Sequence, residues 1–199
     1  MDSLDERLKD ISEIRSMMEQ SSKFLSLSGL SGIAAGTVGV AASLVAWNAL
    51  GRGINEGSTG NVIPFLFIES IVTLVCALGS AAYFSRRMAK QKGVPFWTDG
   101  TKYLLVSLFT PLIAGGLFCL ILLYHDIFLL IAPSMLLFYG LALLNSSKYT
   151  LKEIRYLGFS EIALGLISAM WTDYGLVCWC AGFGLLHIVY GAYMYFKYE

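Results

Sequence analysis

Residues 62–84, VIPFLFIESIVTLVCALGSAAYF, constrain the fold more than any other stretch, because this apolar run is long enough to cross a lipid bilayer. A spanning helix needs about 20 mainly apolar residues. Further apolar runs lie on both sides of it, and only 14% of the residues are charged, against about 25% in an average soluble domain. The sequence therefore predicts an all-α, polytopic membrane protein in contact with the lipid bilayer.

We expect two regions in the chain, a short polar start and a membrane domain at 24–199. The membrane domain contains six predicted spans, at about 24–50, 62–84, 102–124, 127–144, 157–171 and 175–196. Residues 1–23 predict an amphipathic helix, because Leu4, Leu8, Ile11 and Ile14 recur at helical spacing. Six acidic residues on this segment are unlike the basic polar face of a membrane-surface helix. This favours packing on the protein's own cytoplasmic loops or on a soluble partner.

The distribution of basic residues predicts the orientation. Thirteen of the 14 Lys and Arg residues lie in the N-terminal segment, in the loops at 85–102 and 145–156, and at the C-terminus, while Arg52 lies on the opposite side. Under the positive-inside rule, both termini are cytoplasmic. The expected location is a cell membrane, most simply a bacterial inner membrane.

Two glutamates inside apolar runs are the candidates for function. Glu69 lies near the outer end of the second span and Glu161 near the inner end of the fifth, each about 7 to 11 Å from its own surface at 1.5 Å per residue. An ionisable group within a span costs at least about 2.5 kcal/mol, so its presence needs a reason. The opposite depths suggest a 3+3 inverted repeat, spans one to three against four to six.

Each acid lies on a stripe of small or polar residues at helical spacing. Glu69 is followed by Thr73, Cys76 and Ser80, and Glu161 by Gly165 and Ser168. Such stripes predict that both acids face protein, where a carboxyl can bind a proton or cation or can fix the packing of neighbouring helices. The residues leave both readings open.

His187 is a third candidate, on the same helix face as Cys180, Gly184 and Gly191. Its depth is close to that of Glu161, and the short connector at 172–175 predicts an antiparallel hairpin of spans five and six. A carboxylate–imidazole pair is therefore expected as a proton switch, with a hydrogen-bonded structural histidine as the alternative.

Small residues and prolines predict how the helices pack. Ser28, Gly32 and Gly36 recur every four residues in the first span, a spacing that lets another helix approach closely. Pro111 and Pro133 each remove a backbone donor, so a neighbouring helix or water must satisfy the freed carbonyl four residues earlier.

The sequence argues against enzyme, cofactor and metal chemistry. Residues 29–32, GLSG, resemble the serine motif of rhomboid-like intramembrane proteases, but this motif lies in the first span, and the second span lacks the histidine and asparagine of that family's oxyanion site. Cys178 and Cys180 point about 200° apart on a helix, so one helix cannot offer both to one metal. No enzyme activity, cofactor, metal or nucleic-acid partner is predicted.

Residues 158–195, GFSEIALGLISAMWTDYGLVCWCAGFGLLHIVYGAYMY, resemble the helix hairpins of HdeD-like small six-span bacterial membrane proteins. The resemblance implies a bacterial inner-membrane protein with a stress role. Our reading of function is a transporter or channel for protons or a small solute, with Glu69, Glu161 and His187 as its polar core. The alternative is a scaffold or sensor that docks a soluble cytoplasmic partner through residues 1–23 and the basic loops. Assembly as a homo-oligomer fits both.

Overall fold

The computed structural model describes residues 28–55 and 62–199, and both parts are helical. The amphipathic helix expected at 1–23 lies outside the described residues. The long helices are α2 (Gly29–Asn55), α3 (Val62–Gln91), α4 (Asp99–Tyr124), α5 (Ile131–Ser146) and α6 (Glu153–Met170), followed by a last helix of three segments, α7 (Gly175–Trp179), η5 (Cys180–Leu186) and α8 (His187–Tyr198). Short 3₁₀ turns connect them, at η2 (Phe128–Leu130), η3 (Ser147–Tyr149) and η4 (Thr172–Tyr174).

Within the described residues, five helices are long and apolar enough to cross a membrane. They are Gly29–Gly53, Val62–Gln91, Asp99–Tyr124, Phe128–Tyr149 and Thr172–Tyr198. The multi-pass prediction is confirmed at this level. The predicted fifth span, 157–171, corresponds to α6, whose 18 residues carry Glu153, Arg155 and Glu161. At 1.5 Å per residue α6 is about 27 Å long, so it just approaches the thickness of a hydrocarbon core, and its crossing stays a prediction.

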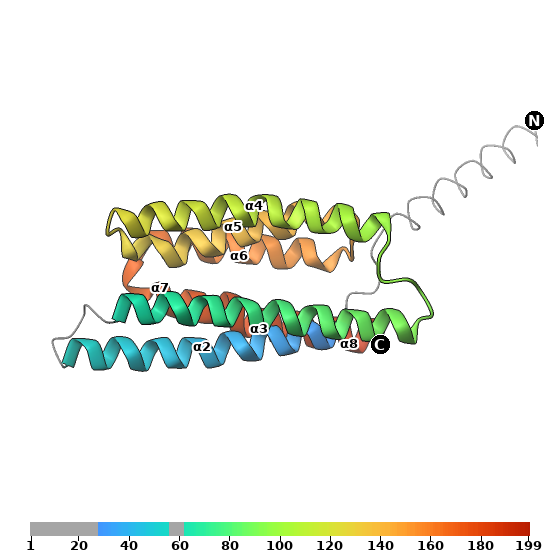
Figure 1. The fold of residues 1–199 in the computed structure, drawn as a ribbon, viewed down its shortest axis with the longest axis horizontal. Coiled ribbons are helices and arrows are strands. Elements are labelled where there is room, and N and C mark those ends of the chain that lie inside the picture. The colour runs from blue at the N-terminus through green and yellow to red at the C-terminus, as the bar shows by residue number, and fades with distance from the viewer. Residues whose placement is uncertain (1–27, 56–61) are drawn as a thin grey trace, which may run out of the picture.

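The helices form two layers (Figure 1). One layer holds α4, α5 and α6, with α5 packed between the other two, and the second holds α2, α3 and the last helix, with α2 packed against both. Contacts of the last helix with α5 and α6 join the layers. The inverted repeat stays a prediction.

The outward faces of α3 and α4 carry large apolar side chains that are more than half exposed. Exposed examples are Ile68, Val75, Val106, Ile113 and Leu117. Soluble monomers rarely expose apolar surface on this scale. These faces therefore require an apolar environment, which a bilayer supplies.

Helix α3 continues well beyond the predicted end of its span at residue 84. It runs through the basic segment to Gln91, and Ser85, Met88 and Ala89 are buried along this extension. The onset of charge marks where an apolar run ends, but a helix persists wherever one of its faces still packs. The α3–α4 connector and the C-terminus lie at the same end of the bundle (Figure 1).

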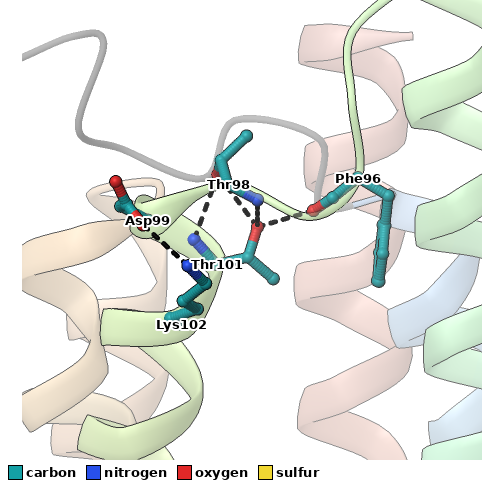
Figure 2. A network of polar contacts seen from close by, with 5 residues as sticks. All are labelled: Phe96, Thr98, Asp99, Thr101 and Lys102. Atoms are coloured by element: carbon teal, nitrogen blue, oxygen red, sulfur yellow. Dashed lines mark hydrogen bonds and ion pairs between the residues drawn. The ribbon is translucent and has the colours of Figure 1, made fainter.

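Helix α4 begins at a capping box (Figure 2). The Thr101 amide donates to Thr98 Oγ1 at 3.2 Å, and the Thr98 amide donates to Thr101 Oγ1 at 3.3 Å. The Thr101 hydroxyl also donates to the Phe96 carbonyl at 2.6 Å, and Lys102 pairs with Asp99 at 2.9 Å. Reciprocal bonds of this kind satisfy amides that have no partner in the first turn, so they fix where α4 starts.

The proline in α4 is compensated by a neighbouring helix. Pro111 leaves the carbonyl of Ser107 without its usual backbone donor. The Asn145 side chain of α5 donates to that carbonyl at 2.9 Å. For Pro111, the prediction that a neighbouring helix or water satisfies the freed carbonyl is confirmed, and the bond ties α4 to α5.

Small residues bring α2 and the last helix into backbone contact. A Cβ added at Gly36 would lie 2.6 Å from the Gly184 carbonyl oxygen, and one at Gly32 would lie 2.9 Å from the Gly191 Cα. Ser28 lies at the end of this face, where its hydroxyl donates to the Glu199 carboxylate at 2.8 Å. Close helix approach in a membrane depends on such positions.

Candidate functional site: a buried glutamate and histidine

Glu161 of α6 and His187 of α8 meet in the interior of the bundle. Glu161 has no exposed surface and His187 is 7% exposed. The His187 Nδ1 atom lies 3.5 Å from Glu161 Oε1. A third helix contributes Tyr139 of α5, whose hydroxyl lies 2.6 Å from His187 Nε2. Three helices thus converge on one imidazole.

The hydrogen bonds of His187 define its neutral tautomer. Nδ1 lies 2.9 Å from the Gly182 carbonyl oxygen, which can only accept. Nδ1 therefore carries the proton and donates to Gly182. In the neutral imidazole Nε2 is then an acceptor, so the Tyr139 hydroxyl donates to it. Both ring nitrogens are satisfied without Glu161.

Glu161 has no hydrogen-bond donor among the described residues. Both carboxyl oxygens are buried and unpartnered, and the hydroxyl of Ser168, two turns further along α6, is in the same condition. The 3.5 Å to Nδ1 exceeds the usual hydrogen-bond length of about 2.7 to 3.2 Å. Burying an ionised carboxylate without donors is very costly, so this arrangement suits a neutral, protonated carboxyl.

A π-helical segment positions the site. Residues 180–186 of the last helix, η5, have the wider turn of a π-helix, in which backbone bonds join residues five apart. The same spacing separates Gly182 and His187, so the imidazole lies beside the Gly182 carbonyl. Gly182 also makes room for Glu161, because an added Cβ would collide with Glu161 Oε2 and with Leu136.

Aromatic rings cover His187 on one side. The Phe183 ring stacks on the imidazole at 6.0 Å between centroids, and Tyr139 lies 4.9 Å from Phe183 and 5.3 Å from His187. This packing restricts the imidazole to small movements about its present position.

A second polar contact joins α6 to the last helix nearer the chain's end. Lys197 Nζ donates to Glu153 Oε1 at 2.6 Å, and the Tyr198 hydroxyl donates to the same oxygen at 2.8 Å. Burial by itself raises the pKa of Glu153, but these two donors outweigh it and leave the pKa below its ordinary value. The contact holds the Glu153 end of the α6–α8 seam closed.

Glu69 does not join Glu161 and His187. It is half-buried on α3, which packs mainly on α2, and its Oε1 accepts from the Thr73 hydroxyl at 3.2 Å. Thr73 and Ser80 lie on the same half-buried face, whereas Cys76 is exposed. In the single chain Cys76 therefore lies outside the inner face of α3, which is narrow because α3 packs mainly on one neighbour, and the predicted role of the stripe stays a prediction.

The site contains two residues that the sequence did not reveal. Tyr139 stands in an apolar run, where a tyrosine gives no more signal than any other aromatic residue. Gly182 contributes a carbonyl, which has no sequence signature, and a regular helix of 3.6 residues per turn would place it away from His187. Among residues 28–55 and 62–199, no three His, Cys, Asp or Glu side chains group closely enough to hold a metal ion.

Comparison of the chain with protein-family models, with curated proteins and with solved structures finds no match. The geometry of the site is therefore the basis on which a function is inferred.

Proposed function

We propose that this membrane protein moves protons, alone or coupled to a small solute, by binding and releasing a proton at Glu161. The observation that carries the proposal is a fully buried carboxyl with both oxygens unpartnered, 3.5 Å from an imidazole N–H. Ionisable residues inside membrane helices commonly serve as proton relays. A purely structural glutamate would be expected to hydrogen-bond its neighbours.

The proton of His187 Nδ1 has two acceptors within reach. In the protonated state of Glu161 this N–H donates to Gly182, as in the structure. When Glu161 releases its proton, the negative charge on Oε1 attracts the same N–H across 3.5 Å, and a charge-assisted hydrogen bond replaces the neutral one. A small rotation of one ring thus compensates the charge that forms.

Tyr139 supports this exchange from the other side of the ring. Its hydroxyl donates to Nε2 in both states, which keeps the proton of the neutral imidazole on Nδ1, the side facing Glu161. The role assigned to His187 is therefore to stabilise the carboxylate, and Glu161 is the group that gains and loses the proton.

The test is proton flux into proteoliposomes, followed with an entrapped pH-sensitive dye under an imposed pH gradient. Glu161→Gln keeps the shape of the neutral carboxyl but cannot ionise, so we expect flux to fall to the level of empty vesicles. The matched control is Glu69→Gln, which removes a half-buried glutamate that contacts neither Glu161 nor His187 and is expected to retain flux. Wild-type flux in the Glu161→Gln variant would falsify the proposal.

A further inference from the structure

The seam between α6 and the last helix, which comprises α7, η5 and α8, differs in character between its two ends. On the Glu153 side, Ile154 and Leu157 of α6 pack with Met194 of α8 in the main cluster of buried apolar side chains, which also contains Leu143 and Leu151. This cluster lies between Glu161 and the Glu153–Lys197 contact along α6. It offers no hydrogen bond to water, and it separates the carboxyl from that end of the bundle.

On the other side of Glu161, the next inward-facing polar group is Ser168. Its side chain has no exposed surface, and its hydroxyl has no partner among the described residues. Gly165, between the two on α6, packs closely against Leu137 and Pro133 of α5. Gly175, at the start of the last helix, leaves room beside the Ser168 hydroxyl, because an added Cβ there would meet that oxygen only at 3.9 Å. Buried polar atoms left unpartnered by protein usually bind internal water.

We infer that water enters the seam from the Ser168 end and hydrogen-bonds Ser168 and Glu161, while the Glu153 end is dry. Seven residues of helix place the two positions about 10.5 Å apart along α6, which a chain of about three waters at hydrogen-bond spacing would bridge. The inference rests on the proposed function in one respect, since these waters would be the route by which a proton reaches Glu161.

Single cysteines test where water reaches. In a background with the four native cysteines replaced, Ser168→Cys and Leu157→Cys are each treated with methyl methanethiosulfonate in liposomes, and intact-protein mass measures modification. The reagent is small and enters lipid, but it reacts with the thiolate, which forms only where water solvates it. We expect the Ser168→Cys variant to react at least about ten-fold faster.

A lipid-facing control and an unfolded control complete the experiment. Leu166→Cys, at an exposed position on α6, gives the rate for a thiol in lipid, and the rates of all three variants in denaturant should agree. Reaction of Ser168→Cys no faster than that of Leu157→Cys or Leu166→Cys would overturn the inference. Met194→Cys repeats the dry-end measurement from α8 if Leu157→Cys fails to fold.

The outcomes separate this inference from the proposed function. Fast modification of Ser168→Cys together with flux that survives Glu161→Gln supports the hydrated route and ends the proton-transport proposal. Slow modification of Ser168→Cys together with flux that depends on Glu161 rules out the hydrated route and leaves the transport proposal standing.

Discussion

At Gly182 the last helix passes close to the Glu161 carboxyl. Any side chain there would occupy space now held by Glu161 Oε2 and Leu136. The same residue provides the carbonyl that binds His187. One position without a side chain therefore fixes both partners of the candidate site.

We predict that Gly182→Ala destabilises the protein, because one extra methyl group in a packed interior costs about 1 to 3 kcal/mol. Thermal unfolding in detergent measures the effect. The control is Gly116→Ala on α4, where an added Cβ meets nothing within 4 Å and better helix propensity contributes up to about 1 kcal/mol. Equal melting temperatures for the two variants would contradict the close approach at Gly182.

At this scale, sequence reasoning found Glu161 and His187 but not Tyr139 or Gly182. Glu161 and His187 are conspicuous because ionisable groups are expensive in an apolar run, and their similar depth follows from counting residues along two helices of a hairpin. Tyr139 and the Gly182 carbonyl depend on contacts between elements. Neither contact leaves a mark in the local sequence.

At the scale of elements, the bond between Asn145 and the Ser107 carbonyl shows how α4 tolerates Pro111. We predict that Asn145→Ala lowers the free energy of unfolding by about 1 kcal/mol, since it leaves a carbonyl unpaired. In a Pro111→Ala background, residue 111 regains an amide that can bond Ser107 within the helix, so the cost of Asn145→Ala should shrink. This double-mutant cycle is measured by unfolding in mixed detergent micelles, and additive effects would argue against the compensation.

Within residues 28–55 and 62–199, the long helices were predictable in order, because long apolar runs separated by charged or glycine-containing segments leave few alternatives. Their ends were not. Helix α3 continues seven residues beyond the predicted span, since Ser85, Met88 and Ala89 find a buried face. Helix α6 carries three charged residues in 18, so composition alone does not establish it as a span.

For the whole molecule, the contact of Lys197 and Tyr198 with Glu153 joins the end of the chain to the start of α6. The pKa of Glu153 lies below its ordinary value of 4.5, so this contact contributes stability in full above pH 4.5 and loses it as the pH falls through the lowered value. We predict a decline in melting temperature below about pH 4.5, and a smaller decline in Lys197→Gln. Identical pH profiles for the two proteins would show that Glu153 is not stabilised by Lys197.

The layered arrangement of the molecule could not be read from the chain. Hydropathy places helices in a membrane without saying which of them touch, and the outer positions of α3 and α4 carry the same apolar residues as the inner ones. The small residues of α2 indicated a close partner. That the partner is the last helix depends on Gly184 and Gly191 lying on its facing side.

The wide turn at residues 180–186 precedes both polar contacts that α8 makes with α6, His187 with Glu161 and Lys197 with Glu153. A π-helical turn accommodates one residue more than an α-helical turn, and each residue of an α-helix rotates the chain by about 100°. If this turn tightened to α-helical geometry, everything after it would rotate as one body. His187 would then leave Glu161 and Lys197 would leave Glu153 together, because both residues follow the turn in one continuous helix.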